Sequence, residues 1–169
     1  GTKMKNPPDL EFGIGKSQVM FNQDALYIYK RIRVVESITN SLTLGKTAVA
    51  IQGKAISPNQ LSSLIHSPCQ EIDIILDPDA YKEALDLGLA LVNHKKLRVV
   101  KLPDQVKVSG ELIDADVNTL GKSKTLKFIK AQPLQGYMDI YKQRLDFYEA
   151  PTQYTHNRRG PNYIDTRGL

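Results

Sequence analysis

The sequence EIDIILDPDAYKEALDLGLAL, from Glu71 to Leu91, decides the fold prediction. It opens with a short apolar run, Ile72 to Leu76, which is typical of a buried strand. Asp77 and Asp79 follow, separated by a proline, and a helical pattern begins at once. Sites in open α/β sheets form at the carboxyl ends of strands. We therefore expect this acidic pair to lie at a functional site.

Strand-like and helix-like segments alternate along the rest of the chain. The expected strands cover residues 31–35, 47–51, 71–76 and 97–102, and the expected helices cover residues 37–44, 57–65, 79–93, 122–131 and 134–148. Ser37 and Ser57 are expected N-caps. This alternation predicts an α/β fold with a mostly parallel four-stranded sheet flanked by helices and followed by a C-terminal helical extension.

Three further segments are predicted from local patterns. Residues 17–21 suggest a short strand, residues 22–29 one or two helical turns, and residues 104–111 a loop or a hairpin. In the last helix, apolar side chains recur on one face, which we interpret as a packing face rather than a base-stacking one. That stripe consists of Met138, Tyr141, Leu145 and Tyr148.

The length of 169 residues predicts one domain with added ends. We expect a lead-in over 1–16, the main domain over 17–134, a C-terminal helix over 135–150 and a flexible tail over 151–169. The chain holds a single cysteine, which excludes an internal disulfide and a multi-cysteine zinc site. A reducing, cytoplasmic setting is expected. No apolar run approaches the roughly 20 residues that cross a bilayer, so no membrane partner is expected.

Acidic residues lie just after predicted strands or just before predicted helices. They are Glu36, the pair Asp77 and Asp79, and the pair Asp114 and Asp116. Parallel strands end at one edge of a sheet, so these groups can converge there. Carboxylate oxygens suit Mg²⁺ or Mn²⁺, and a metal lets acids face phosphate in a chain of net charge +5. The alternative is that each acid caps a helix or lies in its first turn.

Several segments together resemble a Toprim domain, in particular that of bacterial and phage DNA primases. The likeness rests on VVES at 34–37, TAVAIQGKAISPNQLSSLI at 47–65 and DIILDPDAYKEALDLGLAL at 73–91. The segments GKSQVMFN at 15–22 and DADVNTLGKSKTLKFIKAQPL at 114–134 resemble the flanks of that region in phage-type primases. The resemblance covers about residues 15 to 134 and implies a Toprim-like sheet.

The resemblance also implies a site and an activity. Glu36 matches the first-motif glutamate, Asp77 and Asp79 match the Asp-x-Asp motif, and Asp116, more closely than Asp114, matches a later acid. In the family these acids bind Mg²⁺, and the glutamate acts as general acid or base. The implied function is Mg²⁺-dependent synthesis of RNA primers from nucleoside triphosphates on single-stranded DNA. It is expected in the cytoplasm of a bacterial or phage-infected cell.

Two positions depart from the family pattern. Ser37 stands where a glycine is usual, and its Cβ is expected to crowd a tight turn. Asn40 stands where an acid is often found. The sequence shows no zinc ribbon, basic N-terminal primase half or helicase segment. We therefore expect an excised piece, a split primase subunit or a degenerate Toprim, with the rest of a primase or a replicative helicase as partner. The alternatives are a Toprim nuclease and a non-catalytic module that binds replication proteins.

Overall fold

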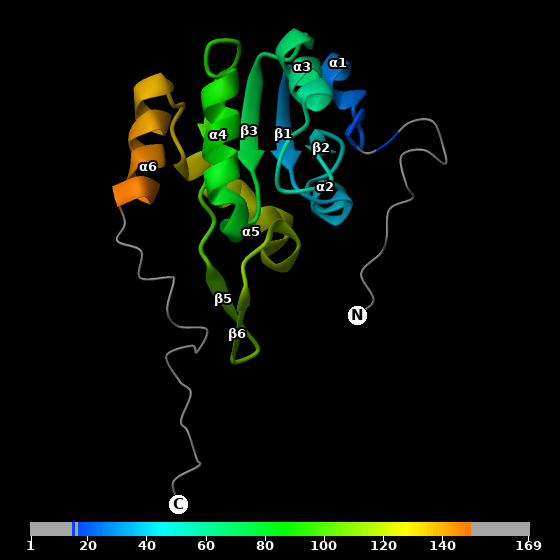
Figure 1. Ribbon diagram of the computed structural model, residues 1–169. Helices are drawn as coiled ribbons and strands as arrows, with labels where there is room; N and C mark the ends of the chain where they lie inside the picture. The colour runs from blue at the N-terminus through cyan, green and yellow to red at the C-terminus, as the bar shows by residue number, and fades with distance from the viewer. Residues whose placement is uncertain (1–14, 16, 150–169) are drawn as a thin grey trace, which may run out of the picture.

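A parallel sheet with the strand order β2-β1-β3-β4 forms the centre of the fold (Figure 1). The structure is a computed structural model that describes residue 15 and residues 17–149. The four strands are β1 (Arg31–Val35), β2 (Ala48–Ala50), β3 (Glu71–Ile75) and β4 (Lys96–Val99). Each neighbouring pair is parallel, which confirms the predicted α/β class. The expected lead-in, apart from residue 15, and the expected tail lie outside the described residues.

Helices cover both faces of this sheet. One layer consists of α1 (Ala25–Ile28), α3 (Pro58–His66), α4 (Tyr81–Leu91) and α6 (Tyr137–Glu149), and the other of α2 (Ile38–Leu44) and α5 (Val117–Ala131). Alternate side chains of a strand point to opposite faces. Val34 and Ile74 accordingly pack with the first layer, and Val35 and Ile75 with the second. No helix within the described residues is long and apolar enough to span a membrane.

Most predicted elements are present close to their predicted bounds. The strand at residues 31–35 is confirmed exactly. Ser37 caps α2, and Ser57 forms a full capping box with Gln60 at the start of α3. The helix predicted from residue 79 begins instead as a 3₁₀ turn, η1 (Pro78–Ala80), which leads into α4.

Residues 104–111 contribute to a hairpin, the second of the two predicted options. It consists of β5 (Gln105–Val108) and β6 (Glu111–Asp114) and projects beyond the edge at which β1 and β3 end (Figure 1). The short strand expected at residues 17–21 is reduced to a single antiparallel bridge between Phe21 and Ala50. The helical turns expected over 22–29 shorten to α1.

The helix predicted over residues 122–131 is the second of two segments of α5. Helix α5 begins at Val117, and Asp116 caps it. Gly121 lies inside it with φ 72° and ψ 167°, a conformation that is essentially restricted to glycine. Two helical segments therefore meet at Gly121. The prediction found only the second because the glycine interrupts the helical pattern.

The packing face predicted for α6 is also wrong. Met138 and Tyr141 are 56% and 38% exposed, whereas Ile140 and Arg144 are buried. Arg144 forms an ion pair with Asp86 on α4. Ile140 packs where α4 has Gly88, whose missing side chain lets α6 approach. Of the remaining stripe, Leu145 is half-buried, and the side chain of Tyr148 is outside the described set.

Candidate functional site

Two predicted acids lie at the edge where neighbouring parallel strands end. Glu36 follows β1 directly, and Asp77 stands two residues after β3. The register pairs Val35 with Ile75, so the two strands end level with each other. The sheet therefore brings Glu36 and Asp77 into the same neighbourhood, as the sequence predicted.

Glu36 is a half-buried carboxylate with an unsatisfied oxygen. Its Oε2 atom is buried and has no hydrogen-bond partner among the described residues. Burial raises the pKa of the Glu36 carboxyl above its usual value, and the negative charges of Asp77 and Asp79 raise that pKa further. The ionised form of Glu36 is thus under-compensated and would gain from a nearby cation.

Asp77 is oriented by Asn40, which departs from the family pattern. Asn40 is 1% exposed, and its Nδ2 donates to Asp77 Oδ1 at 3.0 Å. Ser37 fixes the start of this helix, because its Oγ accepts from the backbone N–H of Asn40 at 3.2 Å. The backbone of Ser37 is extended, with φ −111° and ψ 159°, which any residue adopts. The expectation that its Cβ crowds the turn is therefore wrong.

The pKa of Asp77 is also raised. Burial is the main cause, and the charges of Asp116 and Asp79 act in the same direction. The hydrogen bond from Asn40 opposes the rise, because it favours the ionised carboxylate. Asp116 caps α5, where its Oδ1 accepts from the backbone N–H of Thr119 at 2.6 Å. The capping alternative is thus correct for Asp116, although its charge still acts on Asp77.

Asp79 lies in the first turn of η1 and forms an ion pair with Lys54. The Asp79 side chain is 68% exposed. Lys54 follows β2, so it reaches the same edge of the sheet as the acids. Asp79 therefore already has a cationic partner, whereas Glu36 lacks a hydrogen bond to its buried oxygen within the described residues.

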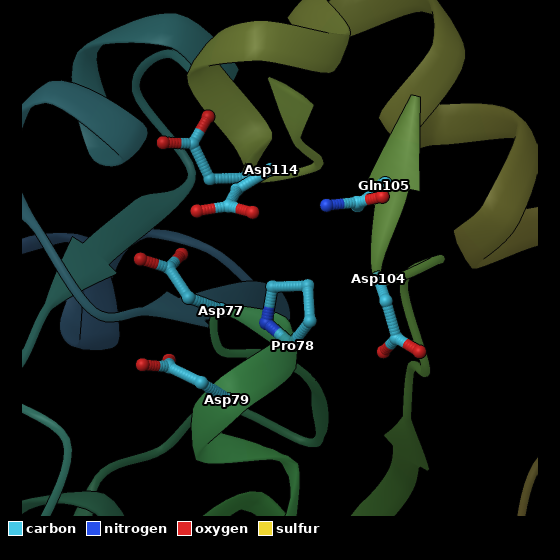
Figure 2. Close-up of a pocket in the computed structure, with 7 residues that line it drawn as sticks. Asp77, Pro78, Asp79, Asp104, Gln105 and Asp114 are labelled. Carbon is cyan, nitrogen blue, oxygen red and sulfur yellow. The ribbon is translucent and has the colours of Figure 1, made fainter. Parts of the chain in front are cut away.

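A cleft of about 460 Å³ opens beside the acids (Figure 2). The residues that line it are Asp77, Pro78, Asp79, Asp104, Gln105, Asp114 and Asp116. Figure 2 shows the carboxylates of Asp77 and Asp79 pointing to the same side, with Asp104 across the cleft beyond Pro78. Glu36 is not part of this lining. The five predicted acids are thus divided between a half-buried position and an open, strongly acidic cleft.

Three neighbours of the site escaped the sequence reasoning as contributors. The sequence marks Asn40 only as a departure from the family pattern, does not single out Lys54, and predicts a loop or a hairpin for residues 104–111, which include Asp104. Lys54 could have been found, since it follows a predicted strand just as the acids do. Asp104 could not, because the hairpin that places it was only one of two predicted options.

The chemistry of these residues fits a divalent cation. The donors are hard carboxylate oxygens, and one of them, Glu36 Oε2, is buried without a hydrogen bond. Among the described residues, no three His, Cys, Asp or Glu side chains are gathered as a complete metal site. Mg²⁺ does not require one, because it usually takes one or two carboxylates together with water and substrate phosphate. Glu36 and Asp77 fit that description.

Solved structures give the fold a context. The chain is similar to a structure of the DnaG catalytic core, with a TM-score of 0.61, 18% identity, and coverage of 85% of this chain and 47% of that one. It is also similar to the RNA polymerase domain of Mycobacterium tuberculosis primase DnaG, with a TM-score of 0.57, 18% identity, and coverage of 89% of this chain and 52% of that one. No protein-family model and no curated protein matches it. The chain thus spans about half the length of these structures and has a primase-related fold.

Proposed function

We propose that this chain is the Toprim-type, metal-binding part of a DNA primase that makes RNA primers on single-stranded DNA. One observation carries the proposal. Glu36 and Asp77 stand at the level ends of adjacent parallel strands, and Glu36 keeps a buried carboxylate oxygen without a hydrogen bond in the described part of the chain. The fold shared with DnaG structures supports the same reading.

In this proposal Glu36 and Asp77 hold Mg²⁺, or Mn²⁺, with Asp79 and Asp116 contributing from the cleft. The bound ion supplies positive charge for the triphosphate and the leaving oxygen. Asn40 keeps the Asp77 carboxylate in one orientation through its hydrogen bond. Preorganised groups of this kind reduce the reorganisation that a reaction requires.

Glu36 is the general acid or base of the proposed reaction. A carboxyl group transfers protons efficiently when its pKa lies near the working pH. Burial and the neighbouring acids raise the pKa of Glu36 in that direction. Asp79 forms an ion pair with Lys54. In the proposed reaction, an incoming phosphate replaces Asp79 as the anion that Lys54 contacts.

Primer synthesis tests the proposal. The assay combines the chain with single-stranded template, nucleoside triphosphates and Mg²⁺, and supplies the remaining half of a primase catalytic region. We expect primers from the wild type and none from the Asp77→Ala, Asp79→Ala double variant. Priming that survives the double change would reject the assignment. Cut template without extension would indicate a nuclease instead.

A second candidate is a non-catalytic module that binds replication proteins. It is favoured by the engagement of two site acids elsewhere, since Asp79 pairs with Lys54 and Asp116 caps α5. A ligand that binds only the folded state raises the melting temperature. Mg²⁺ at ten times its dissociation constant would add about 1.4 kcal/mol. A melting temperature that does not respond to Mg²⁺ would favour this module over the enzyme.

A further inference from the structure

Helix α5 carries an unbalanced positive charge. It contains four lysines and no acidic residue, and α2, which packs beside it, has no charged residue. Lys124, Lys127 and Lys130 are exposed. No carboxylate of the described residues forms an ion pair with them. In the opposite layer, α4 and α6 contain both acidic and basic residues. Positive charge is therefore concentrated on the face that α2 and α5 cover.

An arginine cluster extends this charge onto the sheet. We use the name for Arg31, Arg33 and Arg98 together with the acids Glu71 and Asp73. Arg33, Asp73 and Arg98 are direct neighbours across β1, β3 and β4. They occupy the same sheet face as Val35 and Ile75, two residues nearer the start of the strands. A parallel sheet is normally apolar on both faces, so these charged side chains depart from the packing that is usual under a helix.

The arginine cluster keeps surplus positive charge. Asp73 is fully buried and accepts two hydrogen bonds of 2.9 Å from Arg31 and one of 3.3 Å from Arg98. Three guanidinium groups thus face two carboxylates. The Nε atom of Arg33 is buried with no hydrogen-bond partner in the described residues. Burial lowers the pKa of Arg33 despite the charge of Asp73. An additional anion would compensate this group.

Helix α5 connects the cluster with the acidic cleft. Its N-cap, Asp116, lines the cleft. At the other end, the carbonyl of Gln132 accepts from Arg98 Nε at 3.2 Å. All four lysines of α5 belong to its second segment, which runs from Gly121 to the Gln132 end. The lysines therefore lie between the acidic site and the arginines.

The composition of this surface indicates its partner. Lysine is depleted at protein–protein interfaces, which rely on apolar and aromatic anchors. Lysines that contact phosphates gain affinity from counterion release. Phe128 stands among them, is 36% exposed, and can stack on a base. We propose that the exposed lysines of α5 and the arginine cluster form a track for the backbone of a single nucleic-acid strand that leaves the acidic cleft. The choice of a single strand rests on the proposed function.

Oligonucleotide binding tests the track. The probe is a labelled oligothymidylate of about 20 nucleotides, measured by fluorescence anisotropy with the full chain in EDTA over a range of salt concentrations. The test variant is Lys124→Ala, Lys127→Ala, Lys130→Ala. The matched control is Lys82→Ala, Lys107→Ala, Lys142→Ala, which removes three exposed lysines from α4, β5 and α6. Both variants are first checked for an unchanged melting temperature.

We expect the test variant to bind about 100-fold more weakly near 0.1 M salt. The slope of log affinity against log salt should become shallower by about 2, because each single-strand phosphate contact contributes about 0.7. The control should stay within a few-fold of the wild type with the same slope. Equal losses in both variants would overturn the track, because net charge alone would then explain the attraction.

Two further measurements, poly-glutamate binding and primer synthesis, distinguish an acidic protein partner from nucleic acid and the track from the proposed function. Lysine-dependent binding of labelled poly-glutamate without oligonucleotide binding would assign the surface to an acidic protein and overturn the proposal. The EDTA measurement requires no metal and no catalysis. A chain that fails to prime but shows lysine-dependent oligonucleotide binding keeps the track and rejects the proposed function. A chain that primes but binds independently of these lysines rejects the track alone.

Discussion

Two carboxylates on β1 and β3 or just after them are in opposite environments. In the middle of β3, Asp73 is completely buried, and the guanidinium groups of Arg31 and Arg98 donate hydrogen bonds to it. Directly after β1, half-buried Glu36 keeps an oxygen with no hydrogen bond among the described residues. Burial and the charges of Asp77 and Asp79 raise its pKa, and the charge of Lys54 only partly opposes them. A buried charge is tolerated when it is paired. The first carboxylate is thus compensated within the fold, while the second is left under-compensated.

The largest expected effect comes from removing the compensated carboxylate, Asp73. Asp73→Asn removes the charge that three arginines share and leaves guanidinium groups repelling one another in a partly buried place. Loss of one partner from a buried ion pair costs about 3–5 kcal/mol, and the exposure of Arg31 places this site near the lower figure. Urea unfolding measures the loss. Asp79→Asn is the control, since Asp79 is exposed and should change stability by less than about 0.5 kcal/mol. Equal losses would contradict the comparison.

The next largest effect comes from adding a negative charge beside Glu36 and Asp77. Asn40→Asp replaces the amide that donates to Asp77 with a carboxylate, so a hydrogen bond becomes a repulsion. We expect the metal-free protein to lose about 1–3 kcal/mol at pH 7, as for a buried polar group that loses its partner. Mg²⁺ should recover part of the loss, and melting curves with and without Mg²⁺ show whether it does. A variant as stable as the wild type in EDTA would mean that the Asn40 contact matters little.

A smaller effect, a gain in stability, comes from removing the charge of Glu36. The folded state raises the pKa of Glu36, so it favours the protonated form. This contribution is complete below the unfolded pKa and is lost as the pH rises through the folded pKa. Glu36→Gln should therefore be more stable than the wild type at pH 8 in EDTA, by at most about 1 kcal/mol because the group is partly solvated.

The difference should disappear at about pH 3, which is below the unfolded pKa of glutamate, so that the wild-type carboxyl is protonated in both states. Melting temperatures at the two pH values provide the measurement. The same variant should respond less to Mg²⁺ than the wild type does. A variant that is less stable at pH 8 would show that ionised Glu36 is well satisfied.

The smallest effect tests the departure at Ser37. Ser37→Gly installs the residue expected from the family resemblance and removes the cap that Ser37 provides to Asn40. Glycine replaces serine at an N-cap at a cost of only a few tenths of a kcal/mol. Thermal unfolding should barely change, and Mg²⁺ should stabilise this variant as it does the wild type. A marked gain in Mg²⁺ response would revive the idea that the serine crowds the site.

The sequence predicted the sheet well because its strands are short runs rich in β-branched and other apolar residues, with clear ends. The strand over Arg31–Val35 and the caps at Ser37 and Ser57 depend on neighbours in the chain, so local patterns contain them. The buried face of α6 depends instead on Gly88 and Asp86 of another helix. No pattern within α6 reveals those partners.

The site divides in the same way. The convergence of Glu36 and Asp77 follows from strand ends and was predictable. The role of Asn40 was not, because it requires the spatial distance between its amide and Asp77. The ion pair between Lys54 and Asp79 likewise depends on side-chain positions rather than on sequence spacing. The assignment of Glu36 and Asp77 as metal ligands remains a prediction, which the Mg²⁺ experiments address.

Gly121 bears on how distant relatives of this chain can be recognised. Its backbone, with φ 72° and ψ 167°, admits essentially only glycine. It lies five residues after Asp116, between the end of α5 that lines the cleft and the segment that carries all four lysines. Surface residues such as the lysines can be substituted without changing the backbone. A side chain at position 121 would instead change the direction of one segment of α5 relative to the other. A glutamate after one strand, Asp-x-Asp after another, and a final aspartate five residues before an obligatory glycine would therefore outlast overall sequence identity.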